Sequence, residues 1–349
     1  MRRAGWLLMV TVVLAACSSG PSRQAVIGDL AQSVAVPGFQ AVASRVDALD
    51  MAVVLLCADP SAATLQDAQT AWRETRAAWM RTTPFWFGPV TGRSRTLLDW
   101  GMVDPERLEQ VISERDSTTA EDAREFLPAT VRGLGAVELL LFHGPPEEVV
   151  AALRERQRCE YLMAITRVAA DEARAISEEW SGSYAQRVAG DGADALSEDD
   201  AVNFAAGTQV HLLKRLADME VGPALGTTSP TPLIDAIPGA GAGHDTEDYR
   251  QQVGGIRDLY LGPSGDDGLT AVVRARSADA DDRVRVALDE AVSAIDAVEG
   301  SMKDAATAYA PEILLVYQKL KHLQLIWNTE VVSLLGVTVG FTDADGDSG

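Results

Sequence analysis

One carboxylate inside an apolar stretch is the clearest chemical signal in the chain. Glu138 is the only charged residue between Gly133 and Phe142. If this stretch is a buried helix, an ionised Glu138 needs an arginine, a metal ion, backbone donors or a proton, because burying an unpaired charge is costly. From periodicity alone, the more common case is a helix whose single polar residue faces solvent or a structural arginine. Gly133 and Gly135 would let another segment approach closely.

A second chemical signal is Cys17, at the end of a short N-terminal apolar segment. Arg2 and Arg3 precede an apolar run over residues 6–13, and Leu-Ala-Ala stands directly before Cys17. A basic start, a short apolar run and small residues before a cleavage site are typical of a secretory signal. The run is too short to span a bilayer comfortably. Leu-Ala-Ala-Cys resembles the bacterial lipoprotein signal, and the alternative is an ordinary signal with an incidental cysteine.

The lipoprotein interpretation sets the location and the first boundaries of the chain. We expect a signal peptide over residues 1–16 and a lipidated tether over residues 17–25, with Cys17 carrying the lipid. The protein would then lie on the periplasmic side of the cell envelope. Because no Asp follows Cys17, the outer membrane is the expected membrane, reached through the lipid anchor.

Composition argues against nucleic acid as a partner and leaves open whether two cysteines form a disulfide. The 349 residues include 51 acidic and 30 basic side chains, giving a net charge of −21, which disfavours nucleic acid as a partner. Two further cysteines, Cys57 and Cys159, have neither metal-ligand spacing nor a CxxC partner. An oxidising compartment makes a disulfide between them plausible. Two separate buried thiols are the alternative.

Apolar spacing of three and four residues recurs through most of the chain and predicts an all-α protein. A Gly-, Pro-, Ser- and Thr-rich stretch over residues 226–243 is typical of a linker. Residues 213–226 and 323–336 share Leu, Glu, Val, Leu and Gly at five of fourteen positions. This internal repeat predicts two related antiparallel helix bundles, over residues 26–225 and 244–349. Chance similarity of two leucine-rich helix ends is the alternative.

These residues together resemble the imelysin family. Gly133-Leu134-Gly135-Ala136-Val137-Glu138 is similar to its GxHxxE motif, and Trp72 and Trp79 precede a Phe-x-Phe-Gly-Pro sequence as they do in the family. The family has been described both as metallopeptidases and as iron-regulated envelope proteins. The resemblance implies a functional site near the motif residues and this loop: Gly133, Gly135, Glu138, Phe85, Phe87, Gly88 and Pro89.

The departures from the family pattern direct the functional prediction. The family's His falls on Gly135, which has no side chain and cannot bind a metal, so Glu138 is the only candidate ligand left in the motif. No HExxH sequence occurs. We therefore expect a non-catalytic binding or accessory protein in iron or haem acquisition, with iron, haem or other envelope proteins as partners and no cofactor required. A metal-dependent peptidase or hydrolase with an altered ligand set and a scaffold that docks envelope proteins are the alternatives.

The remaining histidines and the tryptophans carry weaker signals. His143, His211, His244 and His322 are dispersed, and an isolated histidine on a helix is more often packed or solvated than a ligand. Trp72, Trp79 and Trp86 are spaced by seven residues. Such a stripe favours a helix core over the wall of a ligand cleft.

Overall fold

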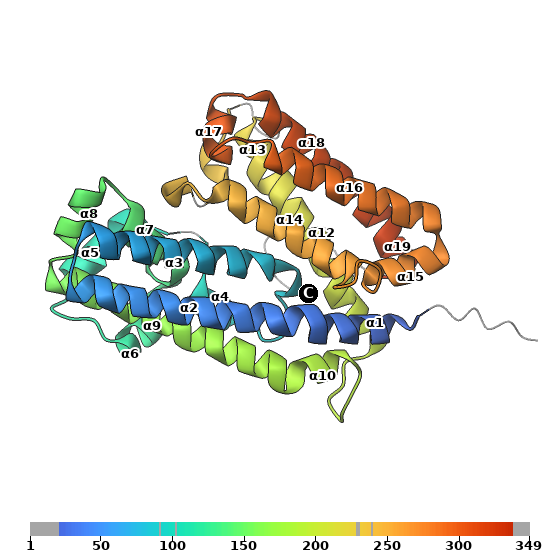
Figure 1. Cartoon of the computed structure of the whole chain (residues 1–349), viewed down its shortest axis with the longest axis horizontal. Helices are drawn as coiled ribbons and strands as arrows, with labels where there is room; N and C mark the ends of the chain where they lie inside the picture. Colours follow the sequence, from blue (N-terminus) through green and yellow to red (C-terminus); the bar gives the residue numbers. More distant parts are fainter. Residues whose placement is uncertain (1–20, 91, 102, 228–230, 239, 338–349) are drawn as a thin grey trace, which may run out of the picture.

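Every regular element that the structure describes is helical. The structure is a computed structural model that describes residues 21–90, 92–101, 103–227, 231–238 and 240–337 (Figure 1). No strand occurs within these ranges, which confirms the predicted all-α class. None of the helices in the same ranges is long and apolar enough to cross a membrane. Cys17 lies outside the described residues.

The first group of helices is built around α2, which packs along both α3 and α9 (Figure 1). The smaller helices α4 to α8 lie between α3 and α9 in the sequence, and α7 packs on both of these long helices. This group comprises α1 (Arg23–Leu30), α2 (Val36–Ala58), α3 (Ala62–Arg81), α4 (Gly92–Leu98), α5 (Pro105–Ser113), α6 (Ala120–Glu125), α7 (Gly133–Phe142), α8 (Pro146–Ala152), α9 (Arg156–Glu179) and α10 (Ala185–Val188).

Local sequence accounts for the helix that contributes most to the site, α3. Ser61 begins it with a capping box, in which the Ser61 hydroxyl accepts from the Thr64 backbone N–H and the Thr64 hydroxyl accepts from the Ser61 N–H. Trp72 and Trp79 are fully buried, so the tryptophan stripe packs in the core. The Trp72 indole donates to the Leu134 carbonyl at 2.9 Å, which fixes α3 against α7.

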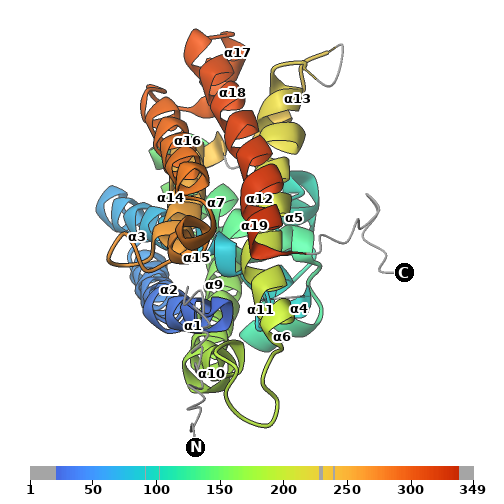
Figure 2. The same ribbon diagram turned by 90° about the vertical axis from the view of Figure 1, so that its right-hand side faces the viewer.

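The second group of helices holds α14, α16 and α18 side by side (Figures 1 and 2). The helices α12 and α18 also pack together, as Figure 2 shows. The group comprises α11 (Glu198–Val202), α12 (Thr208–Lys214), α13 (Gly222–Ala224), α14 (Asp245–Leu261), α15 (Leu269–Arg276), α16 (Ala278–Asp296), α17 (Met302–Thr307), α18 (Pro311–Ile326) and α19 (Val332–Leu335).

Residues 208–224 pack with the C-terminal helices, although the chain reaches them before the predicted linker. The α12 helix and the π-helical segment Arg215–Val221 both contact α18. Leu213 and Leu216 are fully buried, and burying these side chains against α18 stabilises this arrangement. The predicted bundle boundary at residues 226–243 stays a prediction, but contact with α18 begins earlier, at α12, whereas α11 packs on α1.

The backbone of the repeated segments is alike in two respects. A π-helical segment ends at Val221 in the first copy and at Val331 in the second, which are the same position of the repeat. Gly226 and Gly336, the last residues of the two copies, have φ values of 72° and 71°. This left-handed conformation ends helices and strongly favours glycine. The shared sequence positions therefore coincide with shared backbone geometry.

The two groups meet where α14 packs along α3 (Figure 1). At Gly255 of α14, an added Cβ would lie 2.9 Å from the Pro84 ring, so only glycine permits this approach. Beside it, the Arg81 guanidinium donates to both oxygens of Asp258, at 2.6 and 2.8 Å. The α3–α14 contact places side chains of both groups around one buried region.

Candidate functional site

Glu138 lies on α7, and its burial follows from the approach of neighbouring segments. The Glu138 residue is 8% exposed. Gly133 begins α7 with φ at 76°, and a Cβ there would lie 2.7 Å from the Leu98 carbonyl oxygen. Glycine at this position therefore lets the segment after α4 cover the start of α7.

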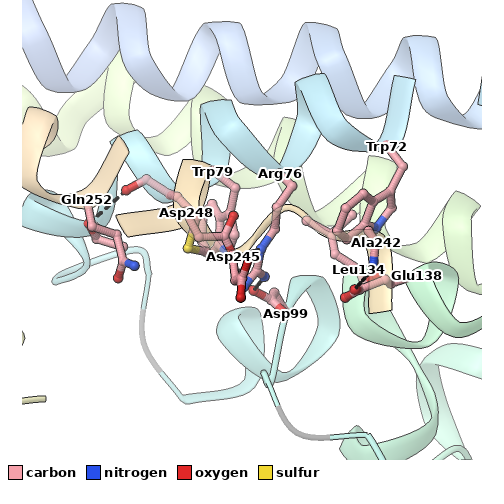
Figure 3. Close-up of polar contacts among 12 residues, drawn as sticks. Trp72, Arg76, Trp79, Asp99, Leu134, Glu138, Ala242, Asp245, Asp248 and Gln252 are labelled. Carbon is pink, nitrogen blue, oxygen red and sulfur yellow. Dashed lines mark hydrogen bonds and ion pairs between the residues drawn. The ribbon is translucent and has the colours of Figure 1, made fainter. Parts of the chain in front are cut away.

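The partner of the Glu138 carboxylate comes from the segment before α14. The Ala242 backbone N–H donates to Glu138 Oε1 at 2.8 Å (Figure 3). Burial raises the pKa of Glu138, while the Arg76 charge and the Ala242 N–H act to lower it. Of the partners expected from the sequence, a backbone donor is therefore present, and the charge of Arg76 favours the ionised carboxylate without a direct ion pair among the described residues.

Gly135, at the position of the family's histidine, is covered by another side chain. A Cβ at Gly135 would lie 2.7 Å from Val103 Cγ2. Real Cβ atoms do not approach other atoms this closely, so Val103 occupies the space that a side chain at this position would need. The absence of an imidazole at this position therefore leaves no empty space, because the Val103 side chain occupies it.

The loop with Phe85, Phe87, Gly88 and Pro89 belongs to an aromatic cluster. Phe85 and Phe87 are buried and pack edge-on against Trp180, at centroid distances of 6.3 and 5.5 Å. Gly88 has φ at 59° and lies against the Tyr184 ring. The rings of the two phenylalanines pack against other aromatic residues, whereas the Glu138 carboxylate accepts the Ala242 N–H and is influenced by the charge of Arg76. A pocket shared by the motif and this loop stays a prediction.

A buried arginine that the sequence reasoning did not select lies at the centre of the junction. Arg76 of α3 donates through Nε to Asp248 Oδ2 at 2.8 Å, and through Nη1 to Asp99 Oδ2 (Figure 3). Trp79 Nε1 donates to the same Asp99 oxygen at 3.1 Å. All three charged residues are more than nine-tenths buried. Because Asp248 belongs to α14, this junction cluster of Arg76, Asp99 and Asp248 ties the two helix groups together.

The junction cluster has more negative than positive charge. When they are ionised, the carboxylates of Asp99 and Asp248 face one guanidinium, and the charge of Glu138 also acts on Arg76. Burial raises the pKa of Asp248 to about 7, although Arg76 opposes this rise. Asp99 Oδ1 and Asp248 Oδ1 are buried and have no hydrogen-bond partner among the described residues. The site can therefore take up a proton near neutral pH, and it retains two free acceptors.

The histidines lie in different surroundings and do not form one site. His244 packs edge-on against Trp72 at 5.9 Å, and burial lowers its pKa to about 4. His322 lies on α18, where its Nδ1 is 3.5 Å from Glu290 Oε2. Within the part of the chain that the structure describes, no group of three or more His, Cys, Asp or Glu residues is arranged to hold a metal ion.

Cys57 and Cys159 are joined by a disulfide that connects the end of α2 to the start of α9. Their Cα atoms are 5.6 Å apart and 102 residues apart in sequence. The structure thus has the disulfide rather than two separate thiols. It fixes the end of the first helix group opposite the loop of Phe85 and Phe87, which packs against residues after α9.

Comparison with known proteins places this arrangement in one family. The model of the family described as Imelysin matches residues 35–324, which confirms the resemblance seen in the sequence. No curated protein matches the chain.

Two crystal structures share the fold. One is of a protein from Parabacteroides distasonis, provisionally described as an iron-regulated protein A precursor. It is 20% identical, with a TM-score of 0.76, and the match covers 91% of this chain and 96% of that one. The other is of an imelysin-like protein from Psychrobacter arcticum, 17% identical, with a TM-score of 0.75. That match covers 96% of this chain and 100% of that one.

Proposed function

The chain belongs to the imelysin family, and from this premise we propose that it is a non-catalytic lipoprotein of the cell envelope. It acts as a binding or accessory protein in iron or haem acquisition. A relative described as an iron-regulated protein A precursor supports the link to iron. The sequence Leu-Ala-Ala-Cys17 supports this location, because a lipid on Cys17 would hold the protein at the periplasmic side of the outer membrane.

The observation that carries the non-catalytic proposal is the replacement at Gly135. A metal-dependent peptidase needs at least three protein ligands and an open coordination position. Here the motif histidine is replaced by Gly135, Val103 fills the space beside it, and the Glu138 carboxylate already accepts the Ala242 N–H. These features argue for a binding protein that has kept the family's buried carboxylate without its imidazole.

The free acceptors of the junction cluster support a role in binding. Asp99 and Asp248 each have one buried oxygen with no partner among the described residues, and buried acceptors of this kind usually have a water, ion or ligand partner. A net negative charge of −21 also favours cationic ligands over anionic ones.

A metal and ligand analysis of the purified protein tests this proposal. We expect ferric iron or haem to raise the melting temperature, because a ligand that binds only the folded state stabilises it. Glu138→Gln should weaken this effect, and Glu121→Gln, on the exposed surface of α6, should not. Stoichiometric zinc in the parent, lost in Glu138→Gln together with peptide cleavage, would establish the peptidase alternative instead. Absence of any stabilising ligand would favour the docking scaffold.

The anchor needs its own experiment. We expect mass spectrometry of the protein from bacterial membranes to find an acylated Cys17 as the first residue, and Cys17→Ser to release the protein from the membrane fraction. The described structure begins one residue before Ser22, whose hydroxyl accepts from the Ala25 N–H at the start of α1. Membrane association that persists in Cys17→Ser would argue against the lipid anchor.

A further inference from the structure

An open cavity of about 300 Å³ lies between α2, α9 and the start of α6, and its lining includes no residue of the motif or the junction cluster. Asp50 and Val54 of α2 line one side, Glu160, Met163, Ala164 and Arg167 of α9 line the other, and Thr118 and Ala120 complete the lining. The size is at the lower end of the range for small-molecule sites, roughly 300–1,000 Å³. Its wall combines charged and apolar side chains.

Asp50 is the buried charge of this cavity. It is 4% exposed, and its Oδ2 atom lies 2.7 Å from Arg167 Nη2. Its Oδ1 atom has no hydrogen bond or ion pair with any described residue. Burial raises the pKa of Asp50 even though Arg167 opposes the rise, so one arginine does not fully compensate this carboxylate.

Glu160 brings a second incompletely paired carboxylate to the same cavity. Its Oε1 atom accepts from Arg156 Nη1 at 2.8 Å. Its Oε2 atom is buried and has no hydrogen-bond partner among the described residues. The cavity wall therefore includes two carboxylates that each have one oxygen without a protein donor among the described residues. The Glu160 oxygen is also buried, and a buried acceptor without a donor is destabilising.

The Cys57–Cys159 disulfide holds the two walls together. Cys57 follows Asp50 by two helical turns on α2, and Cys159 directly precedes Glu160 on α9. The cross-link therefore restricts the separation of the two helices beside the cavity. A cavity with covalently connected walls is preorganised for a ligand.

We propose that this cavity binds the primary ammonium group of a small alkylamine. An ammonium carries three N–H donors and no acceptor, which suits the free oxygens of Asp50 and Glu160. The side chains of Val54, Met163 and Ala164 provide apolar surface for a short methylene chain. A divalent metal suits the cavity less well, because no group of three or more acidic, His or Cys side chains forms a metal site within the described ranges.

Isothermal titration calorimetry of the purified protein at pH 7 tests the proposal with three probes: 1-aminopentane, 1,5-diaminopentane and the neutral 1-pentanol. We expect saturable one-site binding of both amines and no binding of the alcohol. Asp50→Asn should weaken amine binding at least tenfold, and Glu160→Gln about threefold to tenfold. Asp47→Asn is the matched control, because Asp47 lies on the same helix, pairs with Arg174 and does not line the cavity. Its affinity should stay within twofold of the parent.

Three outcomes would overturn the proposal. The first is equal binding of pentanol and the amines. The second is unchanged amine affinity in a folded Asp50→Asn variant. The third is a loss of amine affinity in Asp47→Asn as large as in Asp50→Asn, which would indicate attraction by the overall charge. If circular dichroism shows that Asp50→Asn does not fold, Glu160→Gln decides by the same criteria. Amine affinity should be unchanged in Glu138→Gln, so failure here is distinguishable from failure of the proposed iron or haem role.

Discussion

Two buried clusters of aspartate and arginine differ in how completely they are paired. In the C-terminal group, Asp281 Oδ1 accepts from the Tyr260 hydroxyl at 2.8 Å and the Thr270 hydroxyl at 2.5 Å. Its Oδ2 accepts from Arg285 Nε at 3.0 Å. Every partner belongs to the same helix group, so this scaffold cluster, comprising Asp281, Tyr260, Thr270 and Arg285, is complete within itself.

The junction cluster is incomplete by the same standard. Asp99 and Asp248 share Arg76, and each has one oxygen without a described partner. The Arg76–Asp248 ion pair joins α3 to α14, whereas Asp99 lies directly after α4. A fully paired buried cluster mainly specifies packing, whereas unpaired acceptors with shifted pKa values mark candidate functional sites. Complete hydrogen bonding of buried polar groups thus characterises the scaffold cluster, and unpaired buried oxygens characterise the junction cluster.

Removing the arginine of each cluster should produce the largest difference. Arg76→Met leaves two buried carboxylates without their cation, and we expect a loss of about 3–5 kcal/mol in the free energy of unfolding. Arg285→Met should cost about 1–2 kcal/mol, because the Asp281 oxygen that bonds the two hydroxyls keeps both donors. Urea denaturation at pH 7.5 measures both. Equal losses would remove the distinction between the clusters.

The second largest expected effect is a pH dependence of the free energy of unfolding that comes from Asp248 in the junction cluster. The folded-state pKa of Asp248 is raised from 3.8 to about 7, so the folded protein binds this proton more tightly than the unfolded chain. Stability from this group is therefore present below pH 4 and lost as the pH rises toward 7, by roughly 4 kcal/mol at most. Asp248→Asn should abolish this loss in unfolding experiments between pH 5 and 8.5. Parallel curves for parent and variant would contradict the pKa of Asp248.

Restoring the family's histidine at Gly135 tests whether Val103 closes the space beside this position. Gly135→His must displace Val103, and we expect a loss of about 1–3 kcal/mol from overpacking. Adding Val103→Ala should recover much of it. Gly182→His is the control, because no atom lies within 4 Å of a Cβ there. If Gly135→His costs no more than this control in urea denaturation, Val103 does not close the site.

Removing one hydrogen-bond donor from each cluster should have the smallest effects on stability, and the two effects should be similar. Trp79→Phe removes one hydrogen bond to Asp99, and Tyr260→Phe removes one to Asp281. Each should cost about 1 kcal/mol, the usual net value of one hydrogen bond. Thermal unfolding of the two variants at one pH checks this. A much larger loss for Trp79→Phe would indicate that indole packing, rather than its N–H, holds Asp99.

Local sequence signals predicted the individual helices well. Helical spacing in the sequence predicts helices over residues 133–142 and 105–113, which coincide with α7 and α5. The same spacing predicts one long helix over residues 147–181, and this prediction is wrong because α8 and α9 are separated at residues 153–155. The apolar period continues across this break, so periodicity could not locate it. The helix α4 was also missed, since seven residues are too few to show a clear period.

The sequence by itself determined the all-α class, the repeated segments and the absence of the motif histidine at Gly135, whereas the burial of Glu138 was decided by the tertiary structure. Arg76 stood beside the tryptophan stripe of α3, but its acidic partners could not be identified from sequence. Asp99 is 23 residues away and Asp248 172 residues away. Only the packing of α14 on α3 brings these charges together, and only tertiary contact puts Val103 beside Gly135. Helix period is a local property, whereas pairing of buried charges depends on which distant surfaces exclude water together.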